Sequence, residues 1–316
     1  MSEPTREFDG EGGLRFLLAP AFHIEARSFR GRRTELDQCF ACWGYDSGTK
    51  SMMDDLPALN FRLEGPPGVG KNEIVYELAR QIERPLYVIQ GHEELTPEDL
   101  ALVLVPNVEQ GSDGVMRFGY HASPLVTALR KGALFFFDEI NRVPERTLAP
   151  LASVLDDRRR IYSALVARDI GPPDEATRNS FRFCCAMNPQ GSARGALPDY
   201  IDERTLPVIR VDYMTLEDLA VILKDNLRPP KALLDSFCAW YKDEAQVQLS
   251  ARQARTLVQY AMSIAARGKA SHIESIREAS TQIGAKPKKG SDDEEDSSDA
   301  ESVSDDAGSS SEDLPE

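Results

Sequence analysis

The stretch LEGPPGVGKNE, residues 63–73, contains most of a phosphate-binding motif. Gly65, Gly70 and Lys71 satisfy the pattern G-x-x-x-x-G-K, in which glycines let backbone N–H groups surround phosphate oxygens and the lysine reaches the β- and γ-phosphates. The motif normally continues with Ser or Thr, whose hydroxyl ligates Mg²⁺, but this chain has Asn72. We predict that a nucleotide binds here. The loop residues expected to contact it are Gly65, Pro66, Pro67, Gly68, Val69, Gly70, Lys71 and Asn72.

The segments around this loop alternate between short apolar runs and helical patterns. Ile74, Val75, Leu78 and Ile82 recur at helical spacing after the loop, and SPLVTALRKG at 123–132 has the features of a capped helix. Strands that alternate with helices of this length form parallel sheets. We therefore predict an α/β fold, with a P-loop parallel sheet and flanking helices. The predicted strands are at 61–64, 86–89, 133–137, 181–186 and 207–211.

After Thr215 the pattern becomes wholly helical, with TLEDLAVILKDN, KALLDSFCAWYKDE and SARQARTLVQYAMSIAARG in succession. From about residue 284 the sequence is of low complexity and too poor in apolar residues to offset the entropy of ordering it. We therefore predict four parts. They are an N-terminal segment at 1–55 that packs on the core, an α/β nucleotide-binding domain at 56–213, a small all-α lid domain at 214–284 and a disordered acidic tail at 285–316.

The net charge of −15 is concentrated near the C-terminus. Residues 291–316 hold 12 of the 52 acidic residues and no Lys or Arg, which leaves 40 acidic residues against 37 basic residues in the rest of the chain. An acidic tail on a nearly neutral body repels phosphate backbones. The charge distribution therefore disfavours nucleic acid as a partner.

The sequence shows no sign of a membrane protein or a secreted protein. No apolar run approaches the roughly 18 residues that a membrane span needs, and the N-terminus lacks the basic and apolar regions of a secretory signal. The five Cys have no disulfide-framework spacing, so we expect reduced thiols in a cytoplasmic protein. Cys39 and Cys42 form a single C-x-x-C without the second ligand pair that zinc needs, and we assign them to helix packing.

A pair of carboxylates follows the apolar run at 133–137. A strand that ends in Asp138 and Glu139, beside a P-loop, places one carboxylate where Mg²⁺ sits on the nucleotide and a second next to it. We expect Asp138 to hold the metal, directly or through its waters, and Glu139 to orient and activate the attacking water. The other interpretation is a strand that happens to end in two acidic residues.

A third apolar strand, in CCAMNPQG, ends in Asn188. An amide at this edge of the sheet can lie between the γ-phosphate and the attacking water. An Asn before Pro is otherwise typical of a turn. Because Asn188 ends one of the predicted parallel strands, we favour the functional interpretation.

Taken together, five stretches resemble a MoxR-type AAA+ ATPase, a P-loop NTPase of the helix-2-insert type. They are GPPGVGKN, GHEELTPEDL, the predicted hairpin with GYHASPLVTALRKGALFFFDEINRVPE, MNPQGSARGALPDYIDERT and LSARQARTLVQYA. The resemblance covers roughly residues 25–282. It implies hydrolysis of ATP with Mg²⁺ in a homo-oligomeric ring, usually a hexamer, with nucleotide between neighbouring subunits. It also implies a chaperone-like role in maturing or remodelling a protein client, commonly with a von Willebrand factor A-domain partner.

The resemblance assigns two arginines that composition does not single out. Arg204, in IDERT, matches the arginine finger that reaches a neighbour's γ-phosphate, although the family usually has Asp-Arg-Phe there; Arg194 is the alternative. Arg252, in SAR at the start of a lid helix, matches sensor 2, with Ser250 as the N-cap. Without the resemblance, either arginine is a solvated charge on a helix. The segment 107–119 would be the insertion hairpin that faces the pore of the ring.

Asn72 bears on how fast such an enzyme turns over. Mg²⁺ usually keeps several waters among its six oxygen ligands, so an amide that reaches one atom farther than Ser weakens metal binding without abolishing it. Glu139 argues against a module that only binds nucleotide, and we predict slow hydrolysis. Two alternatives stay open. One is a nucleotide-binding scaffold with little turnover, and the other is a DNA motor, which the hairpin VPNVEQGSDGVMRFG disfavours because it has one Arg and two acidic residues.

Overall fold

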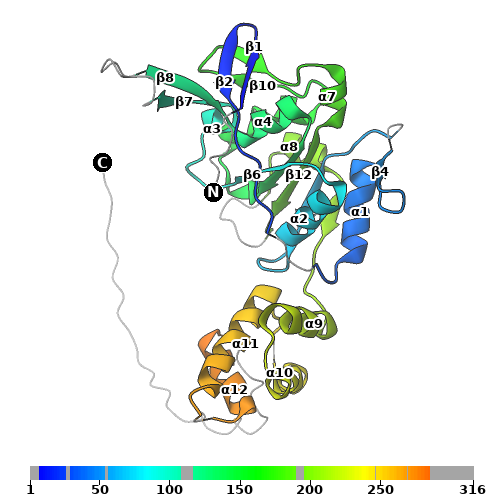
Figure 1. Cartoon of the computed structure of the whole chain (residues 1–316), viewed down its shortest axis with the longest axis vertical. Coiled ribbons are helices and arrows are strands. Elements are labelled where there is room, and N and C mark those ends of the chain that lie inside the picture. Colours follow the sequence, from blue (N-terminus) through cyan, green and yellow to red (C-terminus); the bar gives the residue numbers. More distant parts are fainter. Residues whose placement is uncertain are drawn as a thin grey trace, which may run out of the picture.

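The computed structural model describes residues 7–25, 29–53, 56–107, 117–189, 196–245, 247–268 and 270–284. Within these ranges the chain forms an α/β body that is followed by a group of helices (Figure 1). The tip of the predicted hairpin, the alternative finger Arg194 and the predicted acidic tail lie outside the described residues.

The body is built on a parallel sheet with the strand order β13-β5-β12-β9-β6. Its strands are β5 (Phe61–Glu64), β6 (Leu86–Gln90), β9 (Leu134–Asp138), β12 (Arg182–Met187) and β13 (Val208–Arg210). Phe135, Phe136 and Phe137 are all fully buried, as expected of a strand covered on both faces. The predicted α/β fold with a parallel sheet is therefore confirmed.

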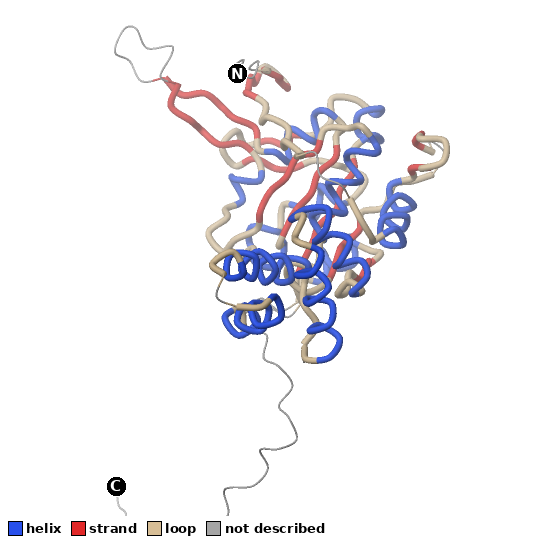
Figure 2. The backbone as a smooth tube through the Cα atoms, turned by 60° about the horizontal axis from the view of Figure 1, so that its bottom comes forward, coloured by secondary structure: helices blue, strands red, loops and turns tan. Residues whose placement is uncertain are grey.

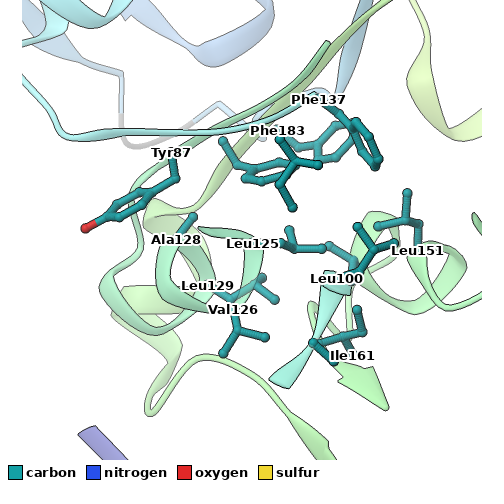
Figure 3. Close-up of a cluster of buried hydrophobic side chains, with 14 of the residues drawn as sticks. Tyr87, Leu100, Leu125, Val126, Ala128, Leu129, Phe137, Leu151, Ile161 and Phe183 are labelled. Atoms are coloured by element: carbon teal, nitrogen blue, oxygen red, sulfur yellow. The ribbon is translucent and has the colours of Figure 1, made fainter. Parts of the chain in front are cut away.

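Helices cover the two faces of this sheet. On one face α1 (Arg33–Trp43) and α2 (Lys71–Ile82) pack against a cluster that includes Phe136. On the other face α4 (Pro124–Lys131) packs Leu125 and Leu129 toward Phe137 (Figure 3). The sequence predicted α4 together with its ends, because Ser123 accepts a hydrogen bond from Val126 N at 3.0 Å and Gly132 ends the helix in the left-handed region.

The C-x-x-C motif lies on α1, where both thiols are buried. Cys39 and Cys42 belong to the hydrophobic cluster between α1, α2 and the sheet. Burial raises the pKa of the Cys42 thiol to about 11, so this side chain stays protonated at neutral pH. The assignment of the motif to helix packing is confirmed.

A second sheet, with the order β1-β2-β8-β7, lies at one end of the body. Its strands are β1 (Phe8–Glu11), β2 (Leu14–Leu17), β7 (Leu102–Asn107) and β8 (Arg117–Ala122). The β7–β8 pair is antiparallel, as the hairpin prediction requires, and it extends away from the body (Figure 2). The sequence did not predict β1 and β2, which add the N-terminal segment to this sheet through β8.

Short elements complete the body. They are β3 (Tyr45–Asp46), β4 (Ser51–Met52), α3 (Pro97–Leu100), η2 (Ile140–Arg142), α5 (Glu145–Leu148), α6 (Leu151–Leu155), β10 (Ile161–Ser163), β11 (Arg168–Ile170), α7 (Glu175–Ser180), α8 (Asp199–Asp202) and η3 (Glu203–Thr205). Of these, η2 follows the predicted metal-binding carboxylate, and α8 with η3 carries the predicted arginine finger.

The helical group after the body has a hydrophobic core of its own, which includes Leu219, Phe237, Trp240 and Leu257. Its helices are α9 (Leu216–Leu227), α10 (Lys231–Asp243), α11 (Ala251–Ala265) and α12 (His272–Gln282). We call this group the lid. The predicted domain boundary near residue 213 falls between β13 and α9. No helix among the described residues is both long and apolar enough to cross a membrane.

Candidate nucleotide-binding site

The loop that joins β5 to α2 depends on glycine at three positions. A Cβ at Gly65 would lie 2.0 Å from the carbonyl oxygen of Val211, so a side chain there would clash with the backbone after β13. Gly68 and Gly70 have φ values of 77° and 102°, in the left-handed region that disfavours other residues. The motif G-x-x-x-x-G-K therefore folds into a loop that ends at the N-terminus of α2, where a phosphate meets free N–H groups and the positive end of the helix dipole.

Lys71 is the first residue of α2, directly after this loop, and is 9% exposed. Its Nζ donates to the carbonyl oxygens of Gly65 at 2.6 Å and Pro66 at 2.9 Å. Burial lowers the pKa of the Lys71 ammonium, while the nearby carboxylates of Asp138 and Glu139 oppose this shift. The ammonium is thus held at the phosphate loop in a partly desolvated position, where a phosphate oxygen is a stronger partner than a carbonyl.

Asp138, at the end of β9, lies directly beside the loop. Its Oδ2 accepts a hydrogen bond from Asn72 Nδ2 at 2.7 Å, and its Oδ1 accepts one from the backbone N–H of Glu139 at 2.9 Å. Burial raises the pKa of Asp138, and Asn72 opposes the shift by its hydrogen bond. Asn72 therefore contacts Asp138 through its amide nitrogen, whereas the sequence suggested that its amide helps to bind the metal.

Glu139 follows in a left-handed conformation with φ of 51°, which is uncommon for a residue with a side chain. This conformation turns the chain from β9 into η2. The carboxylate of Glu139 forms an ion pair with Arg142 Nε at 3.0 Å, and both side chains are partly exposed. The predicted water-activating carboxylate thus has a cationic partner that sequence reasoning did not anticipate.

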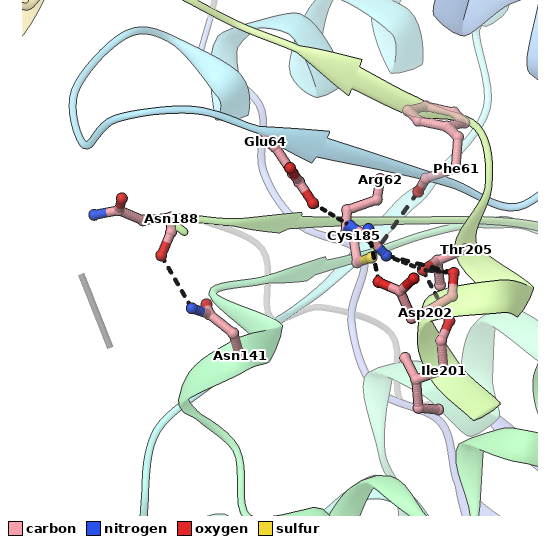
Figure 4. Close-up of polar contacts among 9 residues, drawn as sticks. All are labelled: Phe61, Arg62, Glu64, Asn141, Cys185, Asn188, Ile201, Asp202 and Thr205. Carbon is pink, nitrogen blue, oxygen red and sulfur yellow. Dashed lines mark hydrogen bonds and ion pairs between the residues drawn. The ribbon is translucent and has the colours of Figure 1, made fainter. Parts of the chain in front are cut away.

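Asn188 follows β12 on the strand adjacent to β9. Its backbone carbonyl accepts a hydrogen bond from Asn141 Nδ2 at 3.0 Å, while its own side-chain amide points away from Asn141 (Figure 4). Asn141 is 6% exposed and ties η2 to the end of β12. Sequence reasoning missed Asn141, since its partner is 47 residues away and nothing local marks the contact.

These residues face one pocket of about 570 Å³ between the body and the lid. Of the predicted site residues, the pocket is lined by Pro67, Gly68, Gly70, Lys71, Asn72, Asp138, Glu139, Asn188 and Arg252. Residues that sequence reasoning did not single out also line it, among them Phe29, Arg32, Tyr76, Met214, Leu227 and Arg255. The lining thus combines charged residues at the loop with both apolar and basic side chains from the N-terminal segment and the lid. A nucleotide has matching parts, since its phosphates are charged and its base is a flat, largely apolar ring.

The lid meets the phosphate loop at the start of α11. Ser250 caps this helix by accepting a hydrogen bond from Gln253 N at 3.2 Å, and it is 3% exposed. A Cβ at Gly68 would lie 2.8 Å from Ser250 Oγ and 3.1 Å from Arg252 Cβ. The lid therefore packs closely on the loop, and this packing brings Arg252 to the pocket.

Arg204 lies elsewhere. It belongs to η3, it is exposed, and its Nη1 donates to the carbonyl of Tyr200 at 2.8 Å. It does not line the pocket that contains Lys71, Asp138 and Arg252. The structure thus brings together the predicted loop, carboxylate, Asn188 and lid residues within one chain, and it does not add Arg204 to them.

The donor set suits a nucleotide with Mg²⁺. Mg²⁺ prefers oxygen ligands and is usually held by one or two carboxylates together with substrate phosphates and waters. Asp138 supplies a carboxylate beside Lys71, and each of its oxygens accepts one hydrogen bond, which leaves a lone pair for a metal or a metal-bound water. Lys71 and Asp138 therefore fit the Mg²⁺-bound nucleotide that the fold implies.

Comparison with protein families shows what the body is similar to. Residues 60–204 match the model of the AAA domain (dynein-related subfamily). This part of the chain is therefore similar to an AAA domain, and the parallel sheet with flanking helices has the fold of P-loop AAA+ proteins. Among solved structures the chain is similar to the Thermotoga maritima RuvB Holliday junction branch migration motor. The TM-score is 0.52 at 17% identity, over 80% of this chain and 70% of that one, a similarity of fold alone.

Two relatives share more of the sequence. The denitrification regulatory protein NirQ of Pseudomonas aeruginosa is 29% identical over 170 residues, which are 53% of this chain and 59% of NirQ. An uncharacterized protein of Staphylococcus haemolyticus is 28% identical over 199 residues, which are 60% of this chain and 70% of that protein. The match to NirQ thus spans about three fifths of its length.

Proposed function

We propose that the protein is a MoxR-type AAA+ ATPase that hydrolyses ATP in a ring oligomer and uses the free energy to remodel or mature a protein client. The observation that carries the proposal is the pocket in which Lys71, Asp138, Glu139 and Arg252 meet, from the start of α2, the end of β9 and the start of α11. Binding of a nucleotide with its metal requires Lys71 and Asp138. A second carboxylate beside the metal-binding carboxylate is suitably placed to activate a water that attacks the γ-phosphate.

Each residue has a defined part in this reaction. Lys71 exchanges its carbonyl partners for the β- and γ-phosphates of ATP, and Asp138 with Asn72 holds Mg²⁺, which neutralises phosphate charge when bound. Glu139 accepts a proton from the attacking water. A bond then forms between the water oxygen and the γ-phosphorus, and the bond from that phosphorus to the bridging oxygen breaks, so that ADP leaves with the electron pair.

The remaining residues position groups and stabilise charge. The side-chain amide of Asn188 orients the water, and Arg252 contacts the phosphates from the lid. Arg204 acts on the nucleotide of the next subunit, where a guanidinium stabilises the charge that spreads over the γ-oxygens in the transition state. Its exposed position on η3 supports this role, because an exposed arginine is available to a neighbouring subunit.

The client and the von Willebrand factor A-domain partner belong to the proposal through the family resemblance. The name of NirQ, a denitrification regulatory protein, is compatible with a role in regulating other proteins. We further propose a hexameric ring and a cytoplasmic location, in keeping with the reduced, buried thiols of Cys39 and Cys42.

A second candidate is a nucleotide-operated scaffold with little turnover. The observation in its favour is the hydrogen bond that Asn72 Nδ2 donates to Asp138 Oδ2 at 2.7 Å. This bond must be rearranged before Asp138 Oδ2 can bind the metal. A scaffold would bind ATP and release little phosphate at any Mg²⁺ concentration.

The test is phosphate release from ATP by the wild type and by Glu139→Gln. Because a positioned general base contributes about 10²–10⁴-fold, turnover should fall by that factor while binding of a fluorescent ATP analogue is retained. The matched control is Glu145→Gln, an exposed glutamate at the start of α5, which should keep wild-type turnover. Equal turnover of the wild type and Glu139→Gln would contradict the assignment of Glu139.

A further inference from the structure

Strand β5 carries a charged residue in its interior. Arg62 is 4% exposed, although it lies on a strand between β12 and β13. Its guanidinium has three well-placed partners (Figure 4). Nε donates to Glu64 Oε1 at 2.8 Å, Nη1 donates to Thr205 Oγ1 at 2.8 Å, and Nη2 forms an ion pair with Asp202 Oδ1 at 2.9 Å. A buried guanidinium is tolerated only with such a set of partners.

The partners of Arg62 belong to two functional segments. Glu64 directly precedes Gly65, the first glycine of the phosphate loop. Asp202 and Thr205 lie on either side of Arg204, at the end of α8 and the end of η3. A single guanidinium therefore joins the strand that carries the phosphate loop to the short helical segment that carries the predicted finger.

The backbone around Arg204 is held at further points on the same side. Thr205 is fully buried, and its hydroxyl donates to the carbonyl of Ile201 at 2.9 Å. Asn60, the residue before β5, donates from Nδ2 to the carbonyl of Arg204 at 3.1 Å. The chain on both sides of Arg204 is thus anchored to β5, while the residue itself is exposed.

We propose that Arg62 is a positioning residue for the arginine finger. It fixes η3 to the phosphate-loop strand and so sets where the guanidinium of Arg204 meets the nucleotide of the neighbouring subunit. The inference rests on the proposed function, because it needs Arg204 to act on a neighbour. It adds a residue that touches neither nucleotide nor metal and whose loss damages the neighbour's site rather than its own.

Because loss of Arg62 should damage the neighbour's site, ATP hydrolysis in mixtures of variant subunits tests the inference. Arg62→Met keeps a long apolar side chain and removes the charge, and its turnover should fall about 100-fold, the cost of a misplacement by about 1 Å, while its affinity for ATP is unchanged. Mixed with Lys71→Ala subunits, which keep an intact finger, it should recover part of the activity. Mixed with Arg204→Ala subunits it should recover none, because both partners then lack a working finger.

Two further variants keep the test decisive. Asp202→Asn removes the ion pair at a half-exposed position, so it tests the same link if Arg62→Met fails to fold. Arg182→Met is the matched control. Arg182 is 7% exposed on the neighbouring strand β12, and its Nε donates to the carbonyl of Trp43 at 3.0 Å, away from η3. It should not behave as a finger-deficient subunit in either mixture.

The outcomes separate the inference from the proposed function. The inference would be overturned if Arg62→Met or Asp202→Asn subunits regained ATP hydrolysis when mixed with Arg204→Ala subunits and not when mixed with Lys71→Ala subunits. Arg62 would then serve the phosphate loop of its own chain. Wild-type turnover in both variants would overturn it as well. If Lys71→Ala and Arg204→Ala subunits assemble together and recover nothing, the shared site itself is absent, and the role of Arg62 falls with it.

Discussion

The two ends of strand β5 carry the two halves of the proposed site, and they differ in how completely one chain builds them. At the carboxyl end Lys71 and Asp138 are both less than 10% exposed and are already hydrogen-bonded to the loop and to Asn72. At the other end Arg204 is exposed, although the backbone around it is anchored through Asn60 and Arg62.

This difference indicates that nucleotide binding and transition-state stabilisation depend on different subunits in the proposed ring. The groups that we propose to bind nucleotide and metal are already placed together within one chain, so a single subunit should bind ATP. Arg204, which would stabilise the transition state, is exposed, while the backbone on both sides of it is anchored by hydrogen bonds. Its side chain is therefore accessible to a neighbouring molecule. Binding and turnover should therefore respond differently to mutation and to assembly.

The largest expected effect is the loss of turnover in Arg204→Ala. A finger is worth about 10³–10⁵ in rate, so hydrolysis should fall by that factor while the affinity for ATP stays at the wild-type value. The measurement is single-turnover hydrolysis beside equilibrium binding. Arg178→Ala is the control, since Arg178 is a partly exposed arginine on another helix, where it pairs with the neighbouring Glu175. Weaker ATP binding in Arg204→Ala would break the division described above.

A smaller effect is expected at Asn72. Asn72→Thr removes the hydrogen bond to Asp138 and supplies the hydroxyl that the motif normally has. Since a hydrogen bond contributes about 1 kcal/mol net, the Mg²⁺ concentration for half-maximal turnover should fall about fivefold. The control Asn72→Ala removes the same hydrogen bond and supplies no hydroxyl, so its half-maximal concentration should not fall as far. An unchanged Mg²⁺ dependence in Asn72→Thr would mean that Asn72 does not limit metal binding.

The smallest effect is expected at Arg142, which pairs with Glu139 at 3.0 Å. Both side chains are partly exposed, and such pairs contribute about 0.2–1 kcal/mol. If this pair restrains Glu139, Arg142→Gln should raise the rate of hydrolysis by up to about fivefold at saturating ATP. Slower hydrolysis would show that Arg142 assists Glu139, and it would make η2 part of the catalytic half of the site.

Much of the fold was predictable because its signals are local. The strands of the parallel sheet contain short apolar runs that alternate with helical patterns, most clearly in β9 and β12, and α4 has both its cap residues in the sequence. The hairpin β1–β2 was missed because its strands are four residues each, around a Gly-Gly turn, and β2 pairs with β8 more than 100 residues away. Pairing at that distance leaves no periodic trace in a short segment.

The candidate site divides in the same way. The loop, Asp138, Glu139 and Asn188 follow from motifs at strand ends, and the structure brings them to one pocket. Arg62 and Asn141 were not predictable, since their partners are 140 and 47 residues away. A charge in the run FRLE indicates a solvated strand residue until the position of η3 is known.

The most direct measurement of the shared site mixes Arg204→Ala subunits, which keep an intact phosphate loop, with Lys71→Ala subunits, which keep an intact finger. In a ring with head-to-tail interfaces, about one quarter of the junctions in an equal mixture pair an intact loop with an intact finger. The total rate of ATP hydrolysis by the equal mixture should therefore approach about one quarter of the wild-type rate, although neither variant is active alone. Mixed rings that assemble and yet stay inactive at every ratio would contradict the account and make Arg194 the next residue to test.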